Sequence, residues 1–146
     1  MPYIKTSDNV EIFYQKSGKG KPIIFVHEFA GDHRSWEPQI NFFSRYYNCI
    51  TYSARGYPPS QVPESIEKYS QERAWRDILD VIDKLNIEKA HIIGLSMGGF
   101  ATLHFGINCP NRALSLTIAG CGYGAKADIK NKNEGFAEES EKNAKD

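Results

Sequence analysis

Residues 94–99, Gly-Leu-Ser-Met-Gly-Gly, place Ser96 in a Gly-x-Ser-x-Gly pattern. The pattern directly follows the apolar stretch 90–93 and directly precedes the stretch 100–103, so the sequence predicts a strand, a tight turn and a helix. In that setting a serine lies at the tip of a strained turn with its hydroxyl exposed at the end of a sheet, where it can act as a nucleophile. Gly94 and Gly98 are expected there, because a Cβ at either position would crowd the backbone around the serine.

A nucleophilic serine needs a general base, because its hydroxyl is weakly reactive by itself. The chain has four histidines, at positions 27, 33, 91 and 104. His91 lies in the predicted strand before Ser96, and His104 lies about 12 Å along the helix that follows, at about 1.5 Å per residue. Neither is expected to reach the serine. His33, in a loop, is the one local candidate.

Composition and charge exclude several other kinds of chemistry. The chain has 146 residues, enough for one domain with a core, and its 18 basic and 18 acidic residues give a net charge of zero. It lacks the concentrated basic surface that nucleic acid or an anionic membrane requires, so no partner of either kind is expected. We expect no secretory signal and no membrane-spanning segment. Three cysteines without Cys-x-x-Cys spacing predict no metal site and no disulfide framework, which fits a cytoplasmic protein.

Strand and helix patterns alternate along most of the chain. Predicted strands cover residues 3–6, 10–14, 23–26, 49–52, 90–95 and 113–119, and predicted helices cover 36–47, 70–85 and 97–108, with Ser70 as an N-cap. Such alternation predicts an α/β fold, a mostly parallel sheet with helices on both faces. The loops 27–35 and 53–61 and the turn at Ser96 then meet at the carboxyl edge of the sheet, where ligands bind.

Taken in order, these motifs resemble the α/β-hydrolase family. The resemblance rests on the hairpin, on Val26-His27 with the loop 28–32, on residues 53–57 (Ser-Ala-Arg-Gly-Tyr) and on residues 94–99, and it covers residues 3 to about 124. It implies the N-terminal part of that fold, with strands through about the sixth. It also implies that Ser96 is the nucleophile, that the backbone N–H groups of Met97 and Phe29 form the oxyanion hole, and that His27 is structural.

The chain departs from the family at Glu28, where most members have glycine. We expect the Glu28 side chain to point away from the site; the alternative is a carboxylate near the oxyanion hole, where it would oppose developing negative charge. The candidate pocket residues are Glu28, His33 and Tyr57, which lie in the loops at the carboxyl edge of the sheet. Trp36 and Trp75 are expected in the core, and Arg55 is expected to brace its own loop through backbone carbonyls.

The family supplies its acid and its histidine after later strands, and neither has a counterpart in this sequence. We therefore expect residues 1–124 to be the N-terminal part of a larger hydrolase core. The polar tail 125–146 is expected to be the start of a cap or lid. An open sheet edge would remain, to be covered by a complementary C-terminal chain or a second copy in a homo-oligomer.

The resemblance implies a serine hydrolase that acts on a small ester or lactone through an acyl-enzyme at Ser96, with the histidine and acid outside this chain. No cofactor is implied. The alternative is a catalytically inactive fragment or a ligand-binding protein on the same fold. Nucleotide binding is disfavoured, because Gly94, Gly98 and Gly99 do not form a Gly-x-Gly-x-x-Gly pattern.

Overall fold

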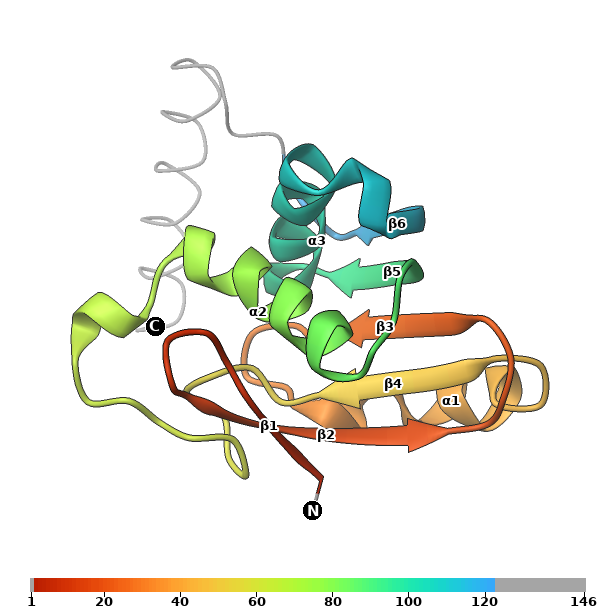
Figure 1. Cartoon of the computed structure of the whole chain (residues 1–146), viewed down its shortest axis with the longest axis horizontal. Helices are drawn as coiled ribbons and strands as arrows, with labels where there is room; N and C mark the ends of the chain where they lie inside the picture. The colour runs from red at the N-terminus through yellow and green to blue at the C-terminus, as the bar shows by residue number, and fades with distance from the viewer. Residues whose placement is uncertain (1, 123–146) are drawn as a thin grey trace, which may run out of the picture.

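Six strands form one sheet in the order β1-β2-β4-β3-β5-β6 (Figure 1). The computed structural model describes residues 2–122, so the predicted cap segment at 125–146 lies outside the described residues. The strands are β1 (Tyr3–Lys5), β2 (Glu11–Ser17), β3 (Pro22–Val26), β4 (Asn48–Tyr52), β5 (Ala90–Leu95) and β6 (Ala113–Ala119). β2 is antiparallel to β1 and to β4, whereas β4, β3, β5 and β6 run parallel. The predicted α/β fold with a mostly parallel sheet is confirmed.

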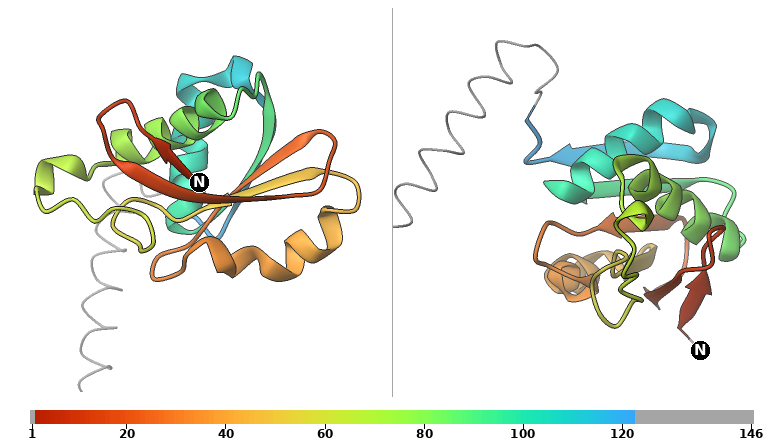
Figure 2. Two further views of the ribbon diagram at one scale, coloured as in Figure 1. Left: turned by 60° about the horizontal axis from the view of Figure 1, so that its bottom comes forward. Right: turned by 90° about the vertical axis from the view of Figure 1, so that its left-hand side faces the viewer.

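Helices cover both faces of the sheet, as predicted. α2 (Gln71–Lys84) and α3 (Met97–Asn108) pack on one face, and α1 (Glu37–Phe43) packs on the other (Figure 2). Three short 3-10 segments, η1 (His33–Trp36), η2 (Ile66–Lys68) and η3 (Pro110–Arg112), connect the larger elements. Ile24 and Ile92 belong to the core beneath α2 and α3, and Phe25 belongs to the core beneath α1.

The central strand β3 brings the carboxyl ends of three strands together. Ile23 to Val26 are all at most 4% exposed, as expected for a strand that is covered on both faces. In the register of the sheet, Val26 lies opposite Tyr52 of β4 on one side and opposite Gly94 of β5 on the other. The loops that follow these three strands therefore leave the sheet side by side.

Local hydrogen bonds decide where the helices begin. The Ser70 side chain accepts a hydrogen bond from the Arg73 N–H, which confirms the predicted N-cap of α2. The helix predicted at 36–47 is shorter than expected. The Asp32 side chain accepts from the Arg34 N–H and starts the 3-10 turn η1, and α1 then ends at Phe43. The strand predicted at 10–14 instead continues to Ser17, because residues 14–17 pair with β4.

An apolar surface remains open at one side of the sheet. Among residues 2–122, no strand pairs with the outer edge of β6. Six large apolar side chains of α3 and β6 are between 36% and 66% exposed: Phe100, Leu103, Ile107, Leu114, Leu116 and Ile118. The prediction that another polypeptide covers this edge stays a prediction. Within the described residues, no helix has the length and apolar character needed to span a bilayer.

Candidate active site

Ser96 adopts a backbone conformation that L-residues rarely take. Ser96 lies between the end of β5 and the first residue of α3, and its φ is 53° and its ψ is −114°. Its N–H donates to the Ala119 carbonyl at 2.8 Å, and its carbonyl accepts from the Phe100 N–H at 3.0 Å and from the Cys121 thiol at 3.1 Å. A non-glycine residue in such a conformation costs about 1–3 kcal/mol, and strain of this kind is concentrated at functional sites. The surrounding hydrogen bonds hold the turn in place.

The two glycines that flank Ser96 are required by close backbone contacts. A Cβ on Gly94 would collide with the Gly98 carbonyl oxygen and with Thr102 Oγ1. A Cβ on Gly98 would collide with the carbonyl oxygens of Val26 and His27. The steric role predicted for both glycines is therefore confirmed, and α3 can start directly against the carboxyl end of β3.

His27 is a structural residue of the loop after β3. The residue is 1% exposed. Nδ1 lies 2.8 Å from the Glu28 carbonyl oxygen, and Nε2 accepts a hydrogen bond from the Ala54 N–H at 2.9 Å. Burial lowers the pKa of His27, so the ring is neutral, with Nδ1 as donor and Nε2 as acceptor. Both ring nitrogens are occupied, and the histidine joins two loops at the carboxyl edge of the sheet.

Glu28 and His33 do not line the cavity that Met97 and Gly98 border. The Glu28 carboxylate accepts a hydrogen bond from Ser35 Oγ at 2.8 Å, which directs it toward η1. His33 Nδ1 lies 2.8 Å from Ser53 Oγ, and its ring packs on Phe13 with the centroids 4.7 Å apart. His33 lines a separate hollow beside β2. The structure thus places two of the three predicted pocket residues elsewhere.

A cavity of about 490 Å³ adjoins the residues that follow Ser96. Its lining comes from the carboxyl ends of β3 and β4, the loops that follow them, and the N-terminal halves of α2 and α3. The residues are Val26, His27, Phe29, Tyr52, Ala54–Tyr57, Val62, Tyr69–Gln71, Ala74, Asp77, Met97, Gly98 and Ala101. Tyr57, predicted as a pocket residue, is among them, and its hydroxyl lies 3.7 Å from Met97 Sδ. Phe29, at the mouth, is 75% exposed.

Comparison with known proteins agrees with this geometry. The profile of a family described as alpha/beta hydrolase fold matches residues 21–136.

The chain belongs to the alpha/beta hydrolase fold family.

Several members of this family share substantial similarity with the chain. It is 40% identical over 97 residues to 3-oxoadipate enol-lactonase 1 of Acinetobacter baylyi, covering 66% of this chain and 35% of that protein. It is 36% identical over 104 residues to the AB hydrolase superfamily protein YisY of Bacillus subtilis, covering 70% of this chain and 38% of that protein. The structure of an enol-lactonase from Burkholderia xenovorans LB400 matches with a TM-score of 0.75 at 26% identity, covering 80% of this chain and 45% of that one. The chain therefore spans less than half the length of these relatives.

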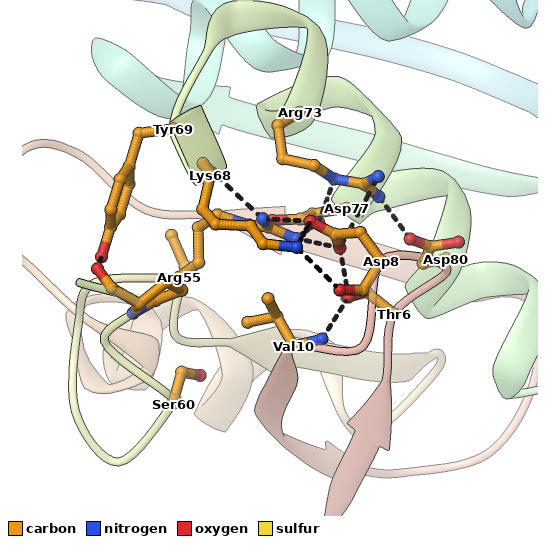
Figure 3. Close-up of polar contacts among 12 residues, drawn as sticks. Thr6, Asp8, Val10, Arg55, Ser60, Lys68, Tyr69, Arg73, Asp77 and Asp80 are labelled. Carbon is orange, nitrogen blue, oxygen red and sulfur yellow. Dashed lines mark hydrogen bonds and ion pairs between the residues drawn. The ribbon is translucent and has the colours of Figure 1, made fainter. Parts of the chain in front are cut away.

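A network of buried charges lies at the base of the cavity in this α/β-hydrolase chain. Figure 3 shows the carboxylates of Asp8 and Asp77 around the guanidinium of Arg55, while Arg73 joins Asp77 to Asp80. The Arg55 hydrogen bonds hold the pKa of Asp8 well below its usual range. Burial raises the pKa of Asp77 despite its contacts with Arg55 and Arg73. The network clamps the β1–β2 turn, the loop after β4 and α2 onto one another.

The network corrects one prediction made from the sequence and explains the burial of two carboxylates. Asp77 and Asp80 of α2 are only 2% and 8% exposed, because arginines pair with them. Arg55 was expected to brace its loop through backbone carbonyls. It does bond to the Lys68 carbonyl, but its main partners are the two carboxylates of Asp8 and Asp77.

Ser96 has no histidine partner within residues 2–122. His91 Nδ1 lies 2.6 Å from Ser115 Oγ, and His27 and His33 make the contacts given above. His104 follows Ser96 by about two turns of α3, and among the described residues no hydrogen bond joins their side chains. The described residues also contain no group of three or more His, Cys, Asp or Glu side chains placed to hold a metal ion.

Proposed function

We propose that this chain supplies the nucleophile of a serine hydrolase that acts on a small ester or lactone. The observation that carries the proposal is the strained backbone of Ser96 between β5 and α3, with its flanking glycines packed against β3. The enol-lactonase relatives support lactones and esters as the substrate class. Ser96 Oγ attacks the substrate carbonyl while the histidine takes its proton, and the ester or lactone C–O bond breaks as the alcohol oxygen leaves with that proton. Water then hydrolyses the acyl-enzyme, which releases the acid product and restores the serine hydroxyl.

The backbone supports charge stabilisation beside Ser96. The Met97 N–H is at the first position of α3, where helix amides have no intrahelical acceptor, and within residues 2–122 it donates to no other group. The Phe29 N–H is likewise without an acceptor among the described residues. In the proposal these two amides donate to the oxyanion of the tetrahedral intermediate. Loss of one donor of this kind costs about 3–4 kcal/mol in a measured case.

The proposal requires a histidine and an acid from outside residues 2–122. We place their source on a polypeptide segment that covers the open face of α3 and β6, where six apolar side chains are exposed. That face begins next to the Ser96 turn, because β6 ends at Ala119, whose carbonyl accepts from the Ser96 N–H. A segment seated there enters the site from the side of Ser96 opposite to β3.

A fluorophosphonate probe tests the proposal in the protein assembled with the polypeptide segment that supplies the histidine and the acid, and the adduct is located by intact mass and peptide mass spectrometry. We expect an adduct on Ser96 and none in Ser96→Ala. The matched control is Ser65→Ala, an exposed serine whose side chain makes no cap hydrogen bond, and it should label like the unmodified chain. An adduct on another residue, or full labelling of Ser96→Ala, would contradict the assignment. If no adduct forms while the cavity still binds ligands, the alternative of a ligand-binding protein is favoured.

A further inference from the structure

The charged groups that line the cavity are already paired with each other. Arg55 Nε and Nη2 donate to Asp77, both at 2.8 Å, and Nη1 and Nη2 donate to Asp8 at 2.7 and 2.8 Å. Nη1 also donates to the Lys68 carbonyl at 2.9 Å. A guanidinium has five N–H donors, so Arg55 has none left for a ligand. Asp77 accepts from Arg55 and Arg73, and neither charge is available to an anionic or cationic substrate group.

Most of the other polar groups in the lining are occupied as well. Both nitrogens of His27 are engaged. The Tyr69 hydroxyl donates to the Pro63 carbonyl at 2.7 Å, and the Ser70 hydroxyl accepts from the Arg73 N–H. The Tyr57 hydroxyl accepts from the Ala30 N–H at 3.4 Å. The remaining wall is apolar apart from Tyr52 and the exposed Gln71.

Tyr52 differs from these residues, because its hydroxyl has no hydrogen-bond partner within residues 2–122. The side chain lies at the carboxyl end of β4 and is 2% exposed. Trp36 Nε1 and Thr51 Oγ1 are the side-chain atoms of the described residues that are fully buried without a partner. Tyr52 Oη is not among them, and Tyr52 is one of the residues that line the cavity. Burial and the nearby Asp77 carboxylate keep the pKa of Tyr52 well above its usual range, so the phenol remains a donor.

We propose that Tyr52 is a substrate-binding residue whose hydroxyl donates a hydrogen bond to a neutral acceptor, a carbonyl or ether oxygen, on an uncharged apolar group held in the cavity. The inference rests on the proposed function and names its substrate class. A carboxylate in the same place would lose its hydration and find no free cation, which makes its burial unfavourable. The substrate is therefore expected to carry a neutral group on this side of Ser96.

Three ligands of similar size test the proposal in the 146-residue chain: acetophenone, ethylbenzene and phenylacetate. Their dissociation constants are measured by ¹H–¹⁵N correlation spectra, which also report on folding. We expect acetophenone to bind about 2- to 12-fold more tightly than ethylbenzene, the range that corresponds to one net hydrogen bond. Phenylacetate is expected to bind at least about 10-fold more weakly than acetophenone, since no cation is free to pair with it.

Tyr52→Phe removes only the hydroxyl and should abolish the preference for acetophenone over ethylbenzene, while ethylbenzene affinity stays the same. The matched control is Tyr14→Phe, the same change at the cross-strand partner of Tyr52, which does not line the cavity and should keep the preference. A preference that persists in Tyr52→Phe, or phenylacetate binding equal to that of acetophenone, overturns the inference.

The ligand-binding test of Tyr52 and the labelling test of Ser96 can fail independently of each other. Ligand binding needs no catalysis, so Ser96→Ala should bind all three ligands like the unmodified chain. Failure of fluorophosphonate labelling with an intact Tyr52 effect contradicts the serine hydrolase alone. Labelling of Ser96 without any Tyr52 effect contradicts the substrate inference alone.

Discussion

Replacing Arg55 by methionine should destabilise the fold far more than removal of an exposed arginine. Methionine keeps much of the side-chain volume but none of the donors, so the change isolates the ion pairs. In the variant, Asp77, whose side chain is 3% exposed, keeps only Arg73 at 3.1 Å. Asp8 keeps the hydrogen bond from Thr6 Oγ1 at 2.6 Å, and its charged partners are only Lys68 and Arg73, each at 3.7 Å.

The size of the effect follows from the burial of these groups. Removing one partner of a buried ion pair costs about 3–5 kcal/mol, because the other charge stays behind without compensation. Domains of this size are stable by about 5–15 kcal/mol, so the loss is a large part of the total. With a urea dependence of about 2 kcal/mol per M, the unfolding midpoint should fall by about 1.5–2.5 M.

The loss should also depend on pH. The pKa of folded Asp8 is below its unfolded value, so its stabilisation is present above about pH 4 and is lost as the pH falls through the folded pKa. Burial already raises the pKa of Asp77, and without Arg55 it should rise further. Above that pKa the unpaired Asp77 charge lowers the free energy of unfolding of Arg55→Met. Below it Asp77 is protonated and this loss of stability disappears. Between pH 7 and pH 4 the protonation of Asp77 narrows the difference in the free energy of unfolding between Arg55→Met and the unmodified chain. Below about pH 4 the loss of the Asp8 stabilisation in the unmodified chain narrows it further.

Urea unfolding, followed by tryptophan fluorescence at several pH values, measures the unfolding midpoint and its dependence on pH. The matched control is Arg76→Met, which breaks an exposed pair with Glu72 whose side chains are 46% and 65% accessible. Exposed pairs contribute about 0–1 kcal/mol, so the control midpoint should move little. Equal losses in the two variants, or a loss in Arg55→Met that does not change between pH 7 and pH 4, would refute the reasoning.

Two further changes test the elements that position the site. Ser70→Ala removes the N-cap of α2 and should lower the free energy of unfolding by about 1 kcal/mol in urea titrations, whereas Ser65→Ala, which removes no cap hydrogen bond, should not. Gly98→Ala drives a methyl group into the carbonyls of Val26 and His27 and should cost about 1–3 kcal/mol with weaker labelling of Ser96. The control is Gly122→Ala, because a Cβ added at Gly122 has no neighbouring atom within 4 Å. Equal unfolding midpoints for the two glycine variants would argue against the packing described.

The sequence was most informative where local chemistry alone determines structure. β5, α3 and β6 have the bounds predicted from apolar runs and their flanking residues, 90–95, 97–108 and 113–119. The need for glycine at positions 94 and 98 was predictable from the turn pattern, although the groups that exclude a Cβ at Gly98 are the carbonyls of Val26 and His27, which are distant in sequence. Side-chain direction was predictable only in part. The Glu28 side chain points away from the cavity, as expected, and bonds to Ser35. His33 lies in the expected loop, but its contact with Ser53 holds it outside the cavity.

The ionic network was missed because its partners come from four segments far apart in the sequence. The apolar periodicity of α2 assigns Asp77 to the polar side, and only the fold brings Arg55 to meet it across 22 positions. A local signal was nevertheless present: Arg73, Asp77 and Asp80 follow one another at helical spacings of four and three, which puts opposite charges on one face. Such a face indicates ion pairing even when its external partner is unknown.

The network connects the stability of the fold with the chemistry of the cavity. Arg55 and Asp77 line the cavity, but their hydrogen bonds and ion pairs are made within the protein. These contacts hold the β1–β2 turn, the loop after β4 and α2 together. If either charge were free, ligand selection in the cavity would be dominated by charge. Because both charges are paired, the preference of the cavity for one ligand over another depends on its apolar wall and on the hydroxyl of Tyr52. The residues that stabilise this edge of the sheet thereby also keep charged groups out of the cavity beside Ser96.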